Sequence, residues 1–160
     1  MSRKATTPQE TAAELPAWAR GAAGRVLLQG LHLLTRDGAL NSDARRKLKQ
    51  VEHLLGLLAP AVEDVLARHK EPVIVDCGAG KSYLGFLLVA RFLAPAGRGK
   101  VVSIESRSEL VEGARRLADE AGFGPRMGFV AASLDAVKPG ALPERAHLVT
   151  ALHACDTATD

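Results

Sequence analysis

The residues best suited to chemistry lie in a short turn that follows an apolar run. The run Val73–Asp76 ends in a carboxylate, and Gly78 and Gly80 come directly after it. A short run of β-branched residues predicts a buried strand. Glycine lets the backbone turn sharply and lets a ligand approach it without a Cβ in the way. The pattern predicts a ligand-binding turn between this strand and a helix that begins near Ser82.

Three ligand classes bind at turns of this kind: nucleoside triphosphates, dinucleotides and S-adenosylmethionine. A triphosphate-binding loop needs its first glycine at the position of Val75, which lies inside the predicted strand. The dinucleotide fingerprint G-x-G-x-x-G fits Gly78 and Gly80, but Tyr83 stands where its third glycine belongs. Both alternatives fit the sequence less well than the third class, and they stay open.

A second carboxylate lies where the third ligand class would use it. Glu105 ends the next predicted strand along the chain. Ribose presents two hydroxyl donors, and a carboxylate at the tip of a strand can accept both. With the turn, this residue resembles the cofactor site of class I S-adenosylmethionine-dependent methyltransferases. The resemblance implies that the glycines line the methionine part of the cofactor and that the turn after the third strand borders the adenine. The residues that it assigns to the cofactor are Asp76, Gly78, Gly80, Glu105, Ser133 and Leu134.

Strands and helices must alternate to position these residues. The predicted elements are strand Val73–Asp76, helix Ser82–Ala94, strand Val101–Glu105, helix Glu109–Ala121, strand Gly128–Ala132 and strand His147–Leu152. Pro95 is expected to end the first helix, and Ser106 with Glu109 to cap the second. Such alternation implies right-handed crossovers. The predicted fold class is α/β, a Rossmann-like, mostly parallel sheet of the class I methyltransferase type.

Helices are predicted before the sheet begins. Apolar residues at helical spacing indicate one helix over Ala17–Leu34 and a second over residues 44–65, in which Pro60 should cause a kink or a division. We expect residues 1–70 to form a helical segment packed on the core. Residues 71–160 then form the cofactor-binding, Rossmann-like half.

The last ten residues carry a narrower resemblance. Ala151–Asp160 contains Leu-His-Ala-Cys-Asp after the fourth predicted strand, together with Lys47–His53 and Asp76–Lys81 upstream. In this combination the chain resembles a methyltransferase-domain family whose relatives include methyltransferase-like proteins and the glutathione S-transferase C-terminal domain-containing protein. In class I enzymes the loop after the fourth strand faces the transferable methyl group. This implies that His153 and Asp156 position the acceptor or remove its proton, for which a histidine has a suitable pKa.

Composition and charge indicate a single globular domain in a reducing compartment. The two cysteines, Cys77 and Cys155, follow neighbouring strands and are expected to lie close together as reduced thiols, too few to form a metal site. No signal peptide is visible, and no apolar run approaches the ~20 residues that span a bilayer. We therefore expect a cytoplasmic protein without membrane attachment.

The net charge of +3 is concentrated in the N-terminal third, where residues 1–56 hold nine Lys or Arg and five Asp or Glu. A basic helix face makes RNA a weakly preferred acceptor or partner. The residues of this face are Arg45, Arg46, Lys47 and Lys49.

The family pattern continues with three more strands after the fourth, so the predicted sheet is incomplete on its C-terminal side. An open edge leaves backbone groups unpaired. We expect the N-terminal helices, a second copy of the chain or another partner to cover it. Two functions follow. The first is S-adenosylmethionine-dependent methyl transfer to an unidentified acceptor, and the alternative is a non-catalytic nucleotide-like binding or protein-interaction module.

Overall fold

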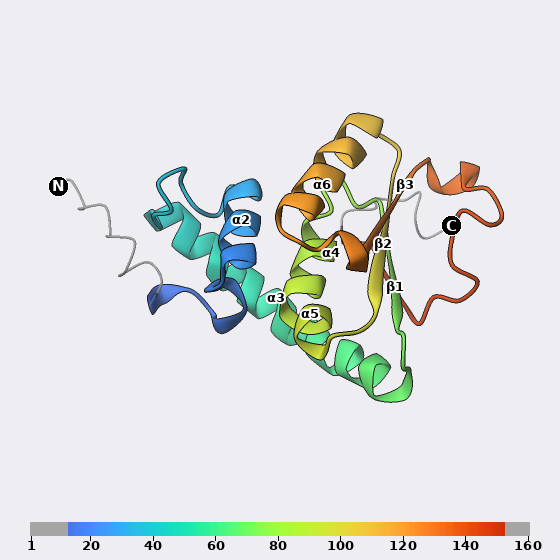
Figure 1. Cartoon of the computed structure of the whole chain (residues 1–160), viewed down its shortest axis with the longest axis horizontal. Helices are drawn as coiled ribbons and strands as arrows, with labels where there is room; N and C mark the ends of the chain where they lie inside the picture. The colour runs from blue at the N-terminus through green and yellow to red at the C-terminus, as the bar shows by residue number, and fades with distance from the viewer. Residues whose placement is uncertain (1–12, 153–160) are drawn as a thin grey trace.

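The chain folds around a four-stranded sheet in which every strand runs parallel to its neighbours. The computed structural model describes residues 13–152. The strands are β1 (Val73–Cys77), β2 (Lys100–Glu105), β3 (Met127–Ala131) and β4 (Leu148–Thr150), in the order β3-β2-β1-β4. Figure 1 labels the first three. The predicted parallel α/β fold is therefore confirmed, and each strand begins and ends within two residues of its predicted limits.

The pairing register brings the carboxyl ends of three strands together. Asp76 of β1 lies opposite Ser103 of β2 and Thr150 of β4, and Cys77 lies opposite Ile104. The chain leaves β3 at one edge of the sheet and returns on the far side of β1 to form β4. Ligands of open parallel sheets bind where the strand order reverses, beyond the carboxyl ends of the strands. The turn after β1 lies at this point.

Helices cover one face of the sheet. The segment α4 (Tyr83–Leu88), a π-helical turn (Val89–Leu93) and α5 (Ala94–Ala96) together join β1 to β2, and α6 (Ser108–Glu120) joins β2 to β3. Their inward side chains form one large apolar cluster with the sheet, in which each fully buried Leu or Phe contributes about 1.5–3 kcal/mol. Its fully buried members include Leu27, Leu28, Ile74, Phe86, Leu87, Leu88 and Val101.

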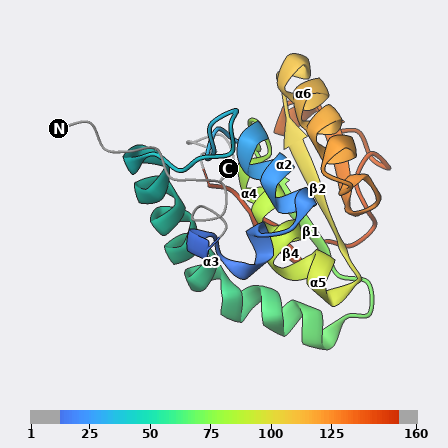
Figure 2. The ribbon, with the colours of Figure 1, turned by 60° about the vertical axis from the view of Figure 1, so that its left-hand side comes forward.

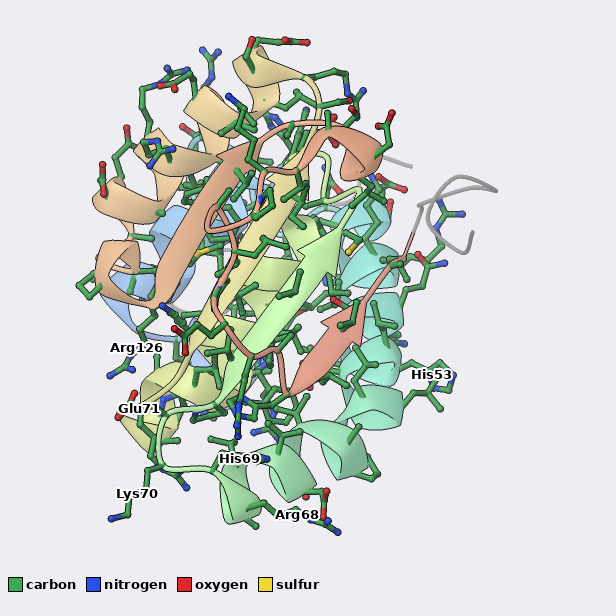
Figure 3. The ribbon with its side chains drawn as sticks, turned by 90° about the vertical axis from the view of Figure 1, so that its right-hand side faces the viewer. His53, Arg68, His69, Lys70, Glu71 and Arg126 are labelled. Carbon is green, nitrogen blue, oxygen red and sulfur yellow. The ribbon has the colours of Figure 1, made fainter. Side chains whose placement is uncertain are left out.

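The opposite face of the sheet is covered by the segment between β3 and β4, which crosses it in Figure 3. Parallel sheets bury both faces, and here a loop and a short 3₁₀ turn provide the second cover. The apolar residues of this second cluster are Val73, Val75, Val102, Ile104, Leu134, Val137 and Leu142. The segment after β3 is therefore packed against the sheet.

The N-terminal helices extend the same core. A 3₁₀ turn, η1 (Ala17–Ala19), and α2 (Ala22–Gly30) lie where one helix over Ala17–Leu34 was expected. The single-helix prediction is wrong because Gly21 adopts the extended backbone of an N-cap between the two elements. One apolar cluster includes residues from both sides of position 70. The predicted division of the chain at that position stays a prediction.

The longest helix, α3 (Ser42–Arg68), is continuous through Pro60. The side chain of Asn41 caps it by accepting a hydrogen bond of 2.8 Å from the backbone N of Ala44. A proline removes one backbone donor and crowds the preceding turn, and the helix bends along its length (Figures 2 and 3). The bend was predicted, whereas a division into two helices does not occur. Within the described part of the chain, no helix is both long enough and apolar enough to cross a membrane.

Pro95 does not end the helix between β1 and β2, contrary to expectation. In the π-helical turn the backbone N of Ala94 donates to the carbonyl of Val89, and the chain stays helical through α5 until Gly97, whose φ is 68°. A proline ring normally clashes with the carbonyl four residues earlier, and a wider turn changes the position of that carbonyl. The local hydrogen-bond pattern therefore accommodates the proline.

At the amino ends of the strands, remote from the glycine turn, side chains connect the sheet to the end of α3. The backbone N of Val73 donates to Nδ1 of His147 at 2.9 Å, and the rings of His147 and His69 lie 3.9 Å apart. Figure 3 labels His69 where α3 ends. Nη2 of Arg98 donates to the carbonyl of Leu66 at 2.6 Å, which satisfies an end of α3. The contacts of His147 hold the beginning of β4 against β1 and the end of α3, and the Arg98 bond joins the segment before β2 to α3.

β4 forms one edge of the sheet within residues 13–152. It pairs with β1 on one side, and Val149 in its middle is 60% exposed. An exposed edge presents unpaired backbone groups to other chains. Cover by a second copy or another partner stays a prediction.

Candidate functional site

The turn after β1 is built from left-handed backbone. Gly78 (φ 62°), Gly80 (φ 58°) and Ser82 (φ 58°) all have positive φ. Glycine adopts this conformation without strain, whereas a residue with a Cβ pays roughly 1–2 kcal/mol. Ser82 is buried, and its carbonyl accepts a hydrogen bond of 2.9 Å from the backbone N of Phe86 at the start of α4. Strain of this kind persists where the surrounding structure fixes the chain, which is common at ligand sites.

Two hydrogen bonds tie this turn to the end of β2. The backbone N of Ala79 donates to the carbonyl of Ile104 at 2.9 Å. The backbone N of Gly80 donates to Oε2 of Glu105 at 2.7 Å. Glu105 is only 5% exposed. The carboxylate that was predicted to meet a ligand therefore also holds the glycine turn in place.

The second oxygen of Glu105 is surrounded by donors from the residues that follow it. Oε1 accepts from the backbone N of Arg107 at 3.0 Å and from its Nε at 2.8 Å. The Arg107 guanidinium is the main cause that lowers the pKa of Glu105 to about 2, and the backbone N–H groups of Arg107 and Gly80 act in the same direction. Glu105 is therefore ionised at neutral pH.

Ser106 does not cap α6, so that prediction is wrong. The N-cap position belongs to Arg107, and no side chain caps the helix there. The hydroxyl of Ser106 instead lies 3.4 Å from Oε1 of Glu105. Because α6 begins at Ser108, Ser106 lies one residue before the N-cap, the position from which a side-chain oxygen accepts from the first N–H groups of a helix.

The other buried carboxylate of the site, Asp76, is paired with a residue of β4. Thr150 donates its hydroxyl to Oδ1 of Asp76 at 2.8 Å, and the same oxygen of Thr150 lies 3.5 Å from the carbonyl of Val75. Burial raises the pKa of Asp76 to about 6, while the hydrogen bond from Thr150 acts in the opposite direction. The Cys77 thiol is half-buried, and its own burial, together with the nearby charge of Asp76, raises its pKa.

The structure brings four of the predicted residues together at the carboxyl ends of β1 and β2: Asp76, Gly78, Gly80 and Glu105. The segment after β3 begins beside them, because the backbone N of Ala132 donates to the carbonyl of Glu105 at 3.0 Å. Beyond it Leu134 packs against the second apolar cluster, and Ser133 is exposed. Contact of Ser133 and Leu134 with an adenine ring stays a prediction.

The residues predicted to act on the acceptor, His153 and Asp156, lie outside the described residues, as does Cys155 with its predicted proximity to Cys77. Among residues 13–152, no group of three or more His, Cys, Asp or Glu side chains is placed to hold a metal ion.

Sequence reasoning missed two residues of this site, Arg107 and Thr150. Arg107 lies two positions after Glu105, and a cation so close to a strand-end carboxylate is a signal that could have found it. Thr150 becomes visible only through the strand register, which places it opposite Asp76.

The basic face of α3 is largely neutralised by nearby carboxylates. Arg45 forms an ion pair with Glu14, while Arg46 and Lys47 both pair with Asp43. The fourth residue of the face, Lys49, is exposed. Surface pairs of this kind reduce the local positive potential that would attract a polyanion.

Parallel strands in this order, joined by helices, define a Rossmann-like α/β protein. A family model described as a methyltransferase domain matches residues 46–160. The chain belongs to this methyltransferase-domain family, as its motifs indicated. No curated protein matches the chain.

Solved methyltransferases are similar to the chain over part of their length. The METTL16 methyltransferase domain is 15% identical, with a TM-score of 0.48, over 88% of this chain and 61% of that one. A putative sarcosine dimethylglycine methyltransferase from Galdieria sulphuraria is 18% identical, with a TM-score of 0.43, over 54% and 29%. The C-terminal domain of precorrin-6Y C5,15-methyltransferase from Rhodobacter capsulatus is 25% identical, with a TM-score of 0.33, over 48% and 40%. The chain thus spans less than two thirds of each.

Proposed function

We propose that the chain binds S-adenosylmethionine at the turn after β1 and serves the transfer of its methyl group to an acceptor. The observation that carries the proposal is the Glu105 carboxylate, which is buried, ionised and hydrogen-bonded to the backbone of Gly80. A fixed acceptor of this kind suits the paired hydroxyls of a ribose. Among residues 13–152, Oε2 accepts from the backbone N of Gly80 alone, which leaves a second acceptor position on that oxygen.

The remainder of the turn suits the methionine end of the same molecule. Gly78 and Gly80 expose backbone without a Cβ, so a ligand can lie directly against the chain. Asp76 lies two positions before Gly78 in the chain and is largely ionised above its pKa of about 6. A carboxylate there would favour the ammonium group of the amino acid. Membership in a methyltransferase-domain family supports this choice of ligand over a dinucleotide or a triphosphate.

The bound cofactor supplies an activated methyl group: the acceptor's lone pair bonds to the methyl carbon, the carbon–sulfur bond breaks, and its electron pair stays on sulfur. What the chain contributes is alignment, because reacting atoms held in line react far faster than free ones. An acceptor that carries a proton needs a base, and we propose His153, oriented by Asp156, for that task on the strength of the sequence motif.

RNA is the acceptor class to test first, and the support for it is limited to the basic residues of α3. Lys49 is exposed, whereas Arg45, Arg46 and Lys47 are engaged with carboxylates. Binding through phosphate contacts must weaken steeply as salt rises. Absence of RNA binding at low salt would remove RNA from the proposal without affecting the cofactor.

Calorimetric titration of the chain with S-adenosylmethionine, NAD and ATP with Mg²⁺ tests the cofactor. We expect S-adenosylmethionine to bind with the lowest dissociation constant. Incubation with S-adenosylmethionine and total RNA, followed by detection of S-adenosylhomocysteine, tests transfer. Binding without any product would remove RNA as the acceptor and would leave the alternative of a non-catalytic binding module standing. Preference for NAD or ATP would contradict the proposal.

A further inference from the structure

One oxygen of the Glu105 carboxylate, Oε1, is already occupied by hydrogen-bond donors of the protein. Oε1 accepts from the backbone N and the Nε of Arg107, and the hydroxyl of Ser106 lies at 3.4 Å from it. Oε2 accepts from Gly80. Each carboxylate oxygen offers about two lone-pair positions. A ribose that needs both oxygens must therefore displace a donor from Oε1.

Only one of the strong donors on Oε1 is free to leave. The backbone N–H of Arg107 is fixed where the chain enters α6. The guanidinium of Arg107, in contrast, is on a side chain that is 61% exposed, and its Nε donates to Oε1 of Glu105. Its release requires rotation of the side chain alone. When the guanidinium leaves, the buried carboxylate keeps its hydrogen bonds from the backbone N of Arg107 and the backbone N of Gly80.

The same guanidinium lies against the glycine turn. A Cβ built on Gly80 would have Nη2 of Arg107 as its nearest neighbour, 3.9 Å away. Gly80 and Glu105 are both residues that the proposed function assigns to the cofactor. Arg107 therefore lies beside the surface that a ligand must reach in order to contact Gly80 and Glu105.

We propose that Arg107 competes with the ribose of S-adenosylmethionine for Glu105 and thereby sets the affinity of the site. The inference rests on the proposed function. Without the cofactor, Arg107 stays paired with Glu105. The ribose must replace the guanidinium before both ribose hydroxyls can form hydrogen bonds with the carboxylate. Arg107 thus weakens binding, in contrast to the cofactor-binding residues around it.

The test is calorimetric titration with S-adenosylmethionine of the wild type, Arg107→Ala and Arg107→Lys. We expect Arg107→Ala to lower the dissociation constant at least about 2- to 5-fold, because the cofactor no longer has to replace the guanidinium on Oε1. Lysine keeps the charge but forms a single-point contact, so Arg107→Lys should lie between the two. Arg68→Ala is the matched control, because Arg68 forms an exposed ion pair with Asp64 on α3, remote from the turn. That variant should bind like the wild type.

Salt gives a second readout, which a purely structural role would not change. Salt screens the exposed pair, since the Debye length falls to about 3 Å at 1 M. The difference in affinity between the wild type and Arg107→Ala should therefore shrink as salt rises. Thermal denaturation of each variant checks that the fold is retained.

Other outcomes would overturn the inference. An unchanged dissociation constant in Arg107→Ala would show that no competition occurs, and a higher one would show that Arg107 contacts the cofactor. If Glu105→Gln loses binding while Arg107→Ala behaves as the wild type, the inference alone fails. If neither the wild type nor Arg107→Ala binds S-adenosylmethionine, the proposed function fails together with it.

Discussion

The hydroxyl of Thr150 lies 2.8 Å from Oδ1 of Asp76, across the pairing of β4 with β1. Asp76 is 2% exposed, and Thr150 is its hydrogen-bond partner among the described residues. Asp76 is the last residue but one of β1, which leads into the glycine turn, and Thr150 ends β4, which precedes the Leu-His-Ala-Cys-Asp motif in the sequence. One hydrogen bond therefore joins the two segments to which a cofactor and an acceptor are assigned.

Removal of the Thr150 hydroxyl should destabilise the fold. In Thr150→Val the shape is kept, but Asp76 is left buried without this donor, which costs about 1–3 kcal/mol. Thr150→Ser keeps the hydroxyl and serves as the control. Urea denaturation at neutral pH measures both variants. A Thr150→Val protein as stable as the wild type would show that the hydrogen bond contributes nothing.

Asp76 should make stability depend on pH in one direction. Its pKa rises from 3.8 to about 6 on folding, so the unfolded chain ionises more readily than the folded one. The contribution of this group is fully present below the lower pKa and is lost as pH rises through about 6. The shift corresponds to about 3 kcal/mol.

Asp76→Asn has no charge to lose, so the comparison isolates this group. Relative to the variant, the wild type should lose about 3 kcal/mol of unfolding free energy between about pH 3.5 and 7.5. Glu105 titrates in both proteins, and its effect cancels in the difference. Denaturation curves at several pH values provide the measurement. Parallel pH profiles for the two proteins would contradict the assignment.

Gly80 should be intolerant of a side chain. At a φ of 58° an alanine costs roughly 1–2 kcal/mol, although no atom other than Arg107 Nη2 lies within 4 Å of the added Cβ. Gly56 is the matched control, because it lies inside α3 with open space around it, and Gly56→Ala should stabilise the helix by about 0.5–1 kcal/mol. Opposite signs are expected in thermal denaturation. Equal effects would show that the backbone of the turn is not the cause.

The sequence was informative wherever the signal is local. The strand limits and the glycines follow from residue types and short spacings, so Asp76, Gly78 and Gly80 were found before the fold was known. Glu105 was found in the same way, as the last residue of a predicted strand. The cap of α3 at Asn41 is equally local.

The contacts that depend on packing were not found. Thr150 contacts Asp76 because β4 pairs with β1 in a register that places the two residues opposite each other. Local sequence patterns do not reveal which register two distant strands adopt. Pro95 was expected to stop a helix, but a π-helical turn accommodates it. Ser106 was expected to cap α6, but the helix has its N-cap one residue later, at Arg107. For Thr150 the pairing of segments distant in sequence, and for Pro95 a change in backbone pattern, outweighed the local signal.

The most direct test of the central claim is the dissociation constant of S-adenosylmethionine for the wild type and for Glu105→Gln, measured by calorimetry at neutral pH. Glutamine keeps the shape of Glu105 but removes the charge, and a hydrogen bond to a charged group is worth about 1.5–3 kcal/mol. The exposed Glu63 on α3 offers Glu63→Gln as the control. The account predicts that Glu105→Gln binds at least about tenfold more weakly than the wild type and that Glu63→Gln binds with the affinity of the wild type. Equal affinity of Glu105→Gln and the wild type would contradict it.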